Sequence, residues 1–147
     1  MSSEIYLQEL ETFFLALADK TRLRLLNLMR DEEVCVCFFT EVLGESQPKI
    51  SRHLAYLRNA GLVEARRDGK WMHYRIVEPE NEVAKRVLRE TLGGLTERDE
   101  MREDYEKLYV ACCGVSVPVT ISRAPKPDTF ANAHITQGRE ELDTFLL

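Results

Sequence analysis

Apolar residues recur every three to four positions along much of the chain, the spacing that places them on one face of an α-helix. The first such stripe consists of Leu10, Phe13, Phe14 and Leu17. Capping residues mark the helix ends, with Asp19 before the second helix and Gly44 after the third. Together these patterns predict helices near 4–18, 20–30, 38–44, 47–60, 79–92 and 97–113.

The last two predicted helices are expected to be separate elements. Glu78-Pro79 begins the fifth, Gly93-Gly94 interrupts it, and Thr96 with Asp99 three residues later resembles a cap for the sixth. Beyond residue 113 prolines appear and the helical periodicity fades. We therefore expect one domain over residues 1–113 and a mobile tail over 114–147.

Residues 62–77, LVEARRDGKWMHYRIV, alternate between apolar and polar side chains, as a half-buried pair of strands does. Asp68-Gly69 predicts a two-residue type I′ turn that would pair Ala65 with Met72. The alternation then puts an apolar set on one face and a largely polar set on the other. The apolar set is Val63, Ala65, Met72, Tyr74 and Ile76, and the other set is Glu64, Arg66, Trp71 and His73.

The predicted helix 47–60 has two distinct faces. Its apolar face carries Ile50, Leu54 and Leu57, and its opposite face carries Lys49, Arg52, His53 and Tyr56. A short helix and a tight turn precede it, and the hairpin follows it, which is the order of a helix-turn-helix with a β-wing. The sequence thus predicts a mostly α-helical fold with a small β-hairpin, a winged helix-turn-helix.

The net charge of −5 conceals a basic segment between residues 47 and 76. Seven basic and two acidic residues give this segment +5, so the remainder of the chain carries −10. A basic surface on an acidic chain suits a polyanion such as nucleic acid, although a solvated charged face is the simpler interpretation. The basic residues are Lys49, Arg52, Arg58, Arg66, Arg67, Lys70 and Arg75.

No apolar run approaches the roughly 20 residues that cross a bilayer, and the first residues, MSSEIYLQEL, lack the features of a secretory signal. We therefore expect a cytoplasmic protein without a membrane partner, whose thiols stay reduced. In that compartment Cys35 and Cys37, separated only by Val36, favour metal or redox chemistry over a disulfide. Plain packing in the core is the remaining alternative for the pair.

Several segments resemble the ArsR/SmtB metalloregulators, in particular their arsenic-responsive repressors: LADKTRLRLLNLM, EVCVCFF, SQPKISRHLAYLRNAGLV and RRDGKWMHYRI. The resemblance covers about residues 5–113. It implies a homodimer joined through its first and last helices, which binds a palindromic double-stranded operator and leaves it when an effector binds. Two positions depart from the family pattern. Lys20 stands where proline is common, and Thr40 stands where the nearest arsenic sensors have a third cysteine.

The resemblance implies that Cys35 and Cys37 bind As(III) or Sb(III), soft ions that prefer three sulfur ligands. The third sulfur could come from Cys112 or Cys113 in the last helix, or from a small external thiol such as glutathione. Residues two apart in a regular helix diverge by about 200°, so we expect the chain to unwind locally when both cysteines bind one ion. No catalytic cofactor is expected.

Candidate DNA contacts lie on the fourth predicted helix and the wing. Phosphate contacts are expected from Lys49, Arg52, Arg58, Arg66, Arg67 and Lys70. Base edges are expected to be read by Gln47, Ser51, His53 or Tyr56. Each has a structural alternative: Tyr56 could pack against the wing, and Arg58 could pair with an acidic neighbour.

Three functions compete. The leading hypothesis is a repressor, not an enzyme, that releases its operator when As(III) or Sb(III) occupies Cys35 and Cys37. A second keeps the DNA binding but makes the cysteines a thiol-oxidation switch. The third is a thiol oxidoreductase using Cys112-Cys113, which the sequence favours least because no strand-turn-helix thiol motif surrounds them.

Overall fold

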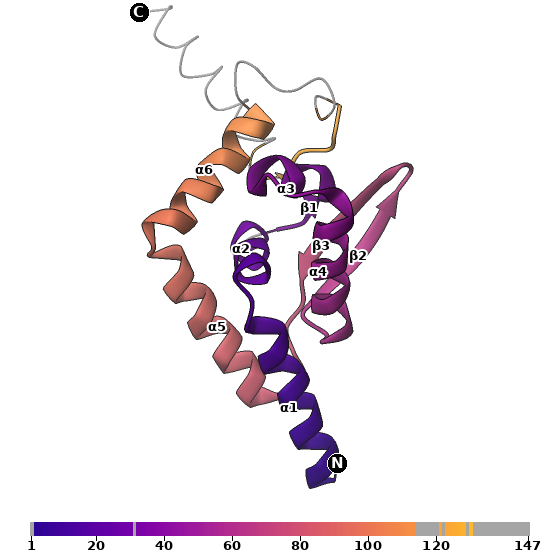
Figure 1. The fold of residues 1–147 in the computed structure, drawn as a ribbon, viewed down its shortest axis with the longest axis vertical. Helices are drawn as coiled ribbons and strands as arrows, with labels where there is room; N and C mark the ends of the chain where they lie inside the picture. The colour runs from indigo at the N-terminus through magenta and orange to yellow at the C-terminus, as the bar shows by residue number, and fades with distance from the viewer. Residues whose placement is uncertain (1, 31, 114–120, 122, 129, 131–147) are drawn as a thin grey trace, which may run out of the picture.

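The structure is a computed structural model that describes residues 2–30, 32–113, 121, 123–128 and 130. Six α-helices and three short strands follow one another in these residues (Figure 1). In chain order they are α1 (Ser3–Leu17), α2 (Lys20–Leu28), β1 (Val34–Cys35), α3 (Val36–Leu43), α4 (Gln47–Asn59), β2 (Val63–Asp68), β3 (Trp71–Ile76), α5 (Glu82–Thr96) and α6 (Asp99–Cys113).

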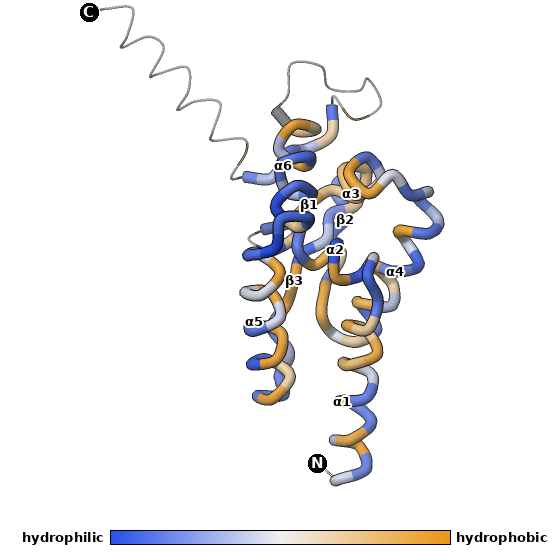
Figure 2. Tube along the Cα trace, turned by 60° about the vertical axis from the view of Figure 1, so that its left-hand side comes forward, coloured by the Kyte–Doolittle hydropathy of each residue, from blue (hydrophilic) through white to orange (hydrophobic). Residues whose placement is uncertain are grey.

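One hydrophobic core joins the helices to one another and to the sheet. Hydrophobic positions recur along α1, α4 and α5 between hydrophilic ones (Figure 2), as the sequence pattern predicted. The predicted apolar face of α4 is fully buried, because Ile50, Leu54 and Leu57 all have no exposed surface. They share the core with Phe38 and Phe39 of α3. The packing of α4 on α3 therefore fixes the direction in which the other face of α4 points.

The wing is part of a three-stranded antiparallel sheet with the strand order β1-β3-β2. The sequence did not predict β1, in which Val34 pairs with Tyr74 and Cys35 pairs with His73. The two faces of the hairpin are as predicted. The predicted register, however, is wrong: Ala65 pairs with Tyr74 and not with Met72.

The register differs because the turn lies one residue later than predicted. Asp68 pairs with Trp71, so Gly69 and Lys70 form the two-residue turn. Gly69 has a φ of 59°, and no non-glycine residue in the described part of the chain has a positive φ. A glycine at the first central position is what a type II′ turn requires, whereas a type I′ turn needs positive φ at both positions.

Helices α5 and α6 also differ from their predicted bounds. Asn81 caps α5, because its side chain accepts hydrogen bonds from the N–H groups of Val83 and Ala84. The helix then continues through Gly93-Gly94 to Thr96. The hydroxyl of Thr96 donates to the carbonyl of Gly93 at 2.8 Å, so it closes α5 instead of capping α6.

Polar side chains attach α6 to α2 across the core. The guanidinium of Arg24 donates two hydrogen bonds to the carboxylate of Asp104, at 2.8 and 3.0 Å. Asp104 is buried, with 4% of its surface exposed. The amide of Asn27 donates to the carbonyl of Met101 at 2.9 Å. These contacts hold the N-terminal part of α6 against the helix-turn-helix.

The predicted mobile tail falls mostly on residues outside the described part of the chain, so the division at residue 113 stays a prediction. Among the tail residues that are described, Ile121, Ala124 and Phe130 are buried. The ring of Phe130 packs on Tyr105 and Tyr109 of α6, with centroid distances of 5.6 and 5.4 Å. In the described part of the chain, no helix is long and apolar enough to span a bilayer.

Candidate thiol site and nucleic-acid interface

Helix α4 has the signals of a helix that begins and ends at defined residues. Ser46 precedes it in an extended conformation and Pro48 lies in its first turn, where its missing N–H costs nothing. Gly61 follows it with a φ of 74°, a value that glycine adopts without strain. The buried face described above leaves the opposite face of α4 to solvent.

The predicted base-reading and phosphate-binding residues of α4 divide into two groups. Gln47, Ser51 and Arg52 are exposed and point away from the core. Lys49 lies beside them, with its ammonium 2.9 Å from the carboxylate of Glu45. These four side chains form the open half of α4 that can reach DNA.

The second group faces the junction of α1 and α2. Arg22 lies 3.3 Å from Nδ1 of His53 and stacks 4.1 Å from the ring centroid of Tyr56. The same guanidinium donates to the carbonyls of Leu15 and Ala16, at 2.9 and 2.8 Å. Tyr56 thus contacts Arg22 and keeps 41% of its surface exposed.

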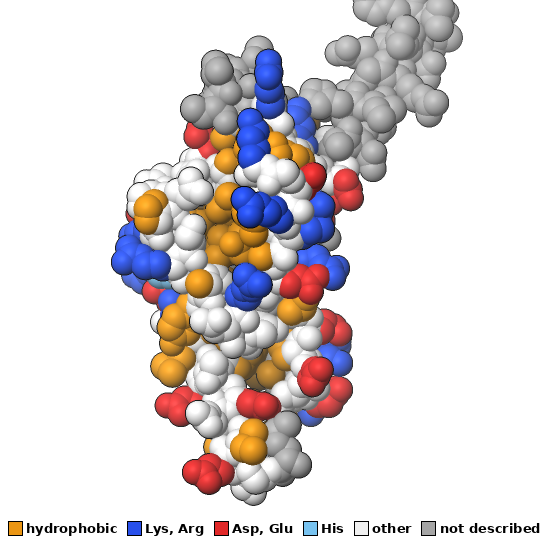
Figure 3. All heavy atoms as spheres, turned by 90° about the vertical axis from the view of Figure 1, so that its right-hand side faces the viewer, with side chains coloured by type: hydrophobic (Ala, Val, Ile, Leu, Met, Phe, Trp, Pro, Cys, Tyr) orange, Lys and Arg blue, Asp and Glu red, His pale blue; other side chains and the backbone are white. Residues whose placement is uncertain are grey.

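Basic side chains also gather on the wing, on the face of the molecule that carries α4 and the hairpin (Figure 3). Arg66, Arg67 and Lys70 are exposed, as is Arg58 at the end of α4. Lys70 lies 4.9 Å from the ring centroid of Trp71, and Arg67 donates to the carbonyl of Gly69 at 3.2 Å. Asp and Glu side chains lie at the opposite end of this face, where α1 begins, and also along its edge beside the basic side chains (Figure 3).

Cys35 and Cys37 lie at the start of α3 with their sulfurs side by side. Cys35 is the N-cap residue, in an extended conformation with φ −71° and ψ 140°, and Cys37 belongs to the first turn. The extended N-cap turns both side chains the same way, and their Sγ atoms are 3.4 Å apart. The expected local unwinding is therefore not needed to bring the two sulfurs together.

The neighbouring sulfurs change each other's protonation. Cys37 donates a hydrogen bond to Cys35, which lowers the pKa of the Cys35 thiol to about 7. The same contact, together with burial, raises the pKa of the Cys37 thiol. Near neutral pH Cys35 is therefore partly ionised, and the thiolate is the form that binds soft ions and reacts as a nucleophile.

The donor set fits two ligands of one soft ion. Thiolates that each lie about 2.3 Å from a shared ion can be at most about 4.6 Å apart, and the observed 3.4 Å satisfies this limit. The described residues contain no group of three or more His, Cys, Asp or Glu side chains arranged to hold a metal. As placed in the described part of the chain, the thiol pair therefore offers two sulfur donors and no third His, Cys, Asp or Glu donor beside them.

Three positions bear on a third ligand beside Cys35 and Cys37. Thr40 lies one turn after Cys37 and donates its hydroxyl to the Cys37 carbonyl at 2.8 Å. Cys112 is fully buried on α6, the helix that packs against α3. Cys113 ends α6, and its side chain lies outside the described part of the chain.

Two residues of this region were not among the predicted site residues. Arg22 organises the base of α4 through the contacts given above. Glu33 lies just before β1, and its carboxylate accepts hydrogen bonds from Arg66 that lower the pKa of the Glu33 carboxyl. Their role depends on contacts between residues about 30 positions apart, which periodicity does not reveal.

Comparisons with known proteins bear on the helix-turn-helix part of this region. The family model for the bacterial regulatory proteins of the arsR family matches residues 19–65. Over 64 residues the chain is 53% identical to the arsenical resistance operon repressor of Escherichia coli, a match that covers 43% of this chain and 55% of that protein. The chain thus spans about half the length of this relative. Over 92 residues it is 36% identical to a transcriptional repressor SmtB homolog of Synechocystis, covering 63% of this chain and 67% of that protein.

A solved structure shows the same architecture. The homodimeric winged helix-turn-helix DNA-binding domain of Mb0332 from Mycobacterium bovis matches with a TM-score of 0.54 at 29% identity. The match covers 66% of this chain and 89% of that one. These proteins are described as regulators, repressors or DNA-binding domains and not as enzymes.

Proposed function

The chain belongs to the arsR family of bacterial regulatory proteins, and from that premise we propose that it is a transcriptional repressor whose signal is As(III) or Sb(III). One observation carries the choice of signal. The two sulfurs of Cys35 and Cys37 lie 3.4 Å apart at the start of α3, the helix on which α4 packs. An effector bound there acts on α3, and α3 packs against α4, the helix that reads the DNA.

In its DNA-binding form the protein is a homodimer on a palindromic operator. Support comes from α1, which carries most of the exposed large hydrophobic side chains among the described residues: Ile5, Tyr6, Leu7, Phe14 and Leu15. On α6, Val110 is 58% exposed. Burying these side chains between two copies would join the protomers through their first and last helices.

Each α4 enters a major groove with its open half. Gln47 and Ser51 read base edges, and Lys49, Arg52 and Arg58 meet phosphates together with Arg66, Arg67 and Lys70 of the wing. His53 and Tyr56 border this surface from their contacts with Arg22. In a dimer, the two recognition helices lie about one helical turn of DNA apart.

The effector is held by Cys35 and Cys37, and a third thiolate completes the site. That thiolate belongs to Cys112 or Cys113 of α6, or to a small thiol such as glutathione. Cys112 is buried and forms no three-donor group with the pair in the described structure, so it joins the pair only after a rearrangement. A small thiol needs no such movement, because Cys37 is not fully buried.

The proposed function is tested by operator binding. A labelled operator is first selected from a random-sequence DNA pool with the effector-free protein, and binding is then followed by fluorescence anisotropy while arsenite is added. We expect arsenite to weaken binding by about 5- to 150-fold, the usual range of allosteric coupling. Cys35→Ser and Cys37→Ser should bind the operator and ignore arsenite. Equal binding by all three proteins with and without arsenite would exclude the metalloid signal.

The thiol geometry also supports a second candidate, a peroxide-sensing repressor. The Cys35 thiolate would attack a hydroperoxide to give a sulfenic acid and a released hydroxide. The Cys37 thiol, 3.4 Å away, would then displace water from the oxidised sulfur to form a disulfide. Release of the operator by hydrogen peroxide but not by arsenite, reversed by dithiothreitol, would select this candidate over the metalloid sensor.

A further inference from the structure

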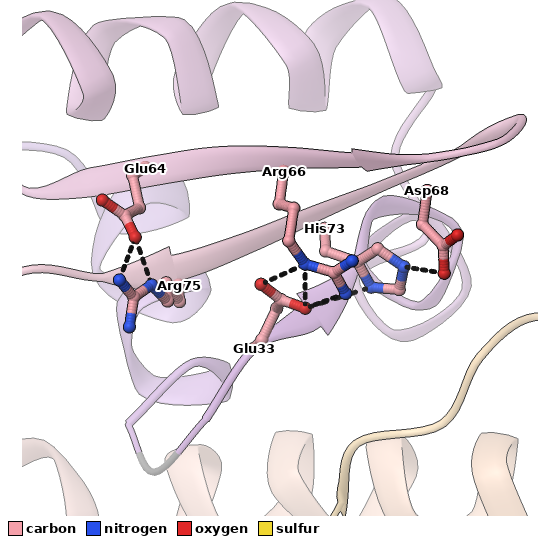
Figure 4. A network of polar contacts seen from close by, with 6 residues as sticks. All are labelled: Glu33, Glu64, Arg66, Asp68, His73 and Arg75. Atoms are coloured by element: carbon pink, nitrogen blue, oxygen red, sulfur yellow. Dashed lines mark hydrogen bonds and ion pairs between the residues drawn. The ribbon is translucent and has the colours of Figure 1, made fainter.

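A carboxylate connects the thiol pair to the wing. Glu33 lies two residues before Cys35, and its carboxylate accepts hydrogen bonds from the guanidinium of Arg66 on β2. Nε and Nη2 of Arg66 lie 3.0 and 2.5 Å from Oε1 of Glu33, and Nε lies 3.2 Å from Oε2 (Figure 4). Nδ1 of His73 lies 3.8 Å from Oε1 of Glu33. Arg66 is a proposed phosphate contact, so Glu33 holds a DNA-binding side chain.

The sheet places Arg66 in the same cross-strand row as Cys35 of the thiol pair. Cys35 of β1 pairs with His73 of β3, and His73 pairs with Arg66 of β2. Directly paired residues point to the same face of a sheet, so the three side chains form one row across it. With strands about 4.8 Å apart, the backbones of Cys35 and Arg66 are about 10 Å apart.

Both residues of strand β1 are packed in the core. Val34 and Cys35 have 1% and 0% of their surface exposed, so neither can move without disturbing the core. Glu33 precedes them directly, and its side chain is 27% exposed while that of Arg66 is 56% exposed. Because Cys35 has no exposed surface, an ion that binds its sulfur must displace β1 to make room, and Glu33 moves with β1 while Arg66 on β2 can separate from it.

The sign of the effect follows from what a repressor must do. If Glu33 withheld Arg66 from DNA, an effector that separated them would strengthen DNA binding, which is the wrong response. If Glu33 holds Arg66 in the orientation that meets a phosphate, separation weakens DNA binding, as release requires. The guanidinium keeps N–H groups for a phosphate, because the hydrogen bonds to Glu33 use only Nε and Nη2.

We propose that Glu33 is a positioning residue that couples the thiol pair to the wing. In the effector-free protein it holds Arg66 in the DNA-binding orientation, and occupation of Cys35 and Cys37 removes that hold. The proposal rests on the proposed function, since it assigns a route for the same signal. It also makes a separate statement about the effector-free protein, which needs no effector to be tested.

The test compares Glu33→Ala with a matched control, Glu64→Ala. Glu64 of β2 forms an ion pair with Arg75 of β3, so its loss removes the same charge from the same sheet without touching β1 (Figure 4). Operator affinity is measured by anisotropy with and without arsenite, and arsenite binding is measured separately by counting arsenic per protomer in the dialysed protein.

We expect Glu33→Ala to bind arsenite like the wild type and to bind the operator about two- to fivefold more weakly without effector, the scale of an exposed ion pair. Its affinity with arsenite should equal that of the wild type, so its response to arsenite shrinks by the same factor. Glu64→Ala should keep the full response. In an Arg66→Ala background, Glu33→Ala should cost no further affinity.

Two results would overturn the coupling. One is a Glu33→Ala protein that keeps the wild-type effector-free affinity and the wild-type fold-change with arsenite. The other is an equal loss of response in Glu64→Ala, which would reduce the effect to general charge. A wild-type protein that binds arsenite and keeps its operator would instead overturn the proposed function. The effect of Glu33→Ala on effector-free operator affinity, compared between the wild type and Arg66→Ala, would then still decide whether Glu33 holds Arg66.

Discussion

The ion pair between Arg24 and Asp104 predicts an asymmetry between two substitutions. Asp104 has 5% of its side chain exposed, whereas Arg24 has 32% exposed. Removing the arginine therefore leaves a charge that water cannot reach, whereas removing the carboxylate leaves a charge that can be partly hydrated. Breaking a buried pair from one side costs about 3–5 kcal/mol. A hydrogen bond to a charged group contributes about 1.5–3 kcal/mol.

Arg24→Met keeps the aliphatic part of the side chain and strands the carboxylate of Asp104, so we expect it to lower the free energy of unfolding by about 3 kcal/mol. Asp104→Asn keeps one acceptor at the same place and leaves a guanidinium with access to water. We expect it to cost about 1–2 kcal/mol. The double variant Arg24→Met/Asp104→Leu leaves no charge behind and should be more stable than Arg24→Met alone.

Urea unfolding followed by circular dichroism measures all three variants. The protein concentration is held constant, because the stability of the proposed dimer would depend on it. The reasoning is refuted if Asp104→Asn costs more than Arg24→Met, or if both cost less than about 0.5 kcal/mol. Either result would mean that the attachment of α6 to α2 does not depend on this pair.

Three further predictions concern the thiols, the DNA contacts and the fold. Because the thiol of Cys37 lowers the pKa of the Cys35 thiol to about 7, the ultraviolet absorbance of the thiolate in Cys112→Ala/Cys113→Ala should rise with pH through about 7. This readout needs no reagent to reach the buried sulfur of Cys35. In Cys37→Ala the midpoint should move up toward the ordinary thiol value of about 8.5, and a wild-type midpoint already at that value would contradict the assignment. Arg52→Ala should weaken operator binding and reduce its salt dependence by about one unit of slope per lost phosphate contact. An unchanged slope would show that Arg52 does not meet a phosphate. Gly61→Ala should lower the free energy of unfolding by about 1 kcal/mol, because alanine is strained at a φ of 74°. Equal urea midpoints would refute it.

The helices and the wing could be predicted from the sequence because their signals are local. Asp19 caps α2, as predicted, by accepting a hydrogen bond from the N–H of Arg22 at 3.0 Å. The apolar positions of α4 alone fixed which of its faces is buried. The predicted helix break at Gly93-Gly94 was wrong. A helix tolerates a glycine, at a cost of about 1 kcal/mol of stability for each one, when tertiary packing favours its continuation. Leu88 of the same helix is buried, with 3% of its surface exposed.

The remaining features depend on contacts between distant segments. Strand β1 is two residues long and exists because it pairs with β3, about 39 positions later in the chain, so no alternation within it announces a strand. That pairing makes Cys35 extended and brings its sulfur beside Cys37. The predicted register of the hairpin was wrong because Asp68-Gly69 and Gly69-Lys70 are both possible two-residue turns. Only the backbone φ values of the structure distinguish them.

Whether Cys35 and Cys37 together receive the signal is decided by a protein that has no other cysteine. In Cys112→Ala/Cys113→Ala these two are the only thiols left, since the chain has four cysteines. Arsenite bound per protomer and operator anisotropy are measured on the same sample, with and without glutathione. With glutathione present to supply a third thiolate, we expect one arsenic per protomer and release of the operator. A double variant that binds no arsenic even with glutathione, or that binds arsenic and stays on the operator, would show that Cys35 and Cys37 do not receive the signal.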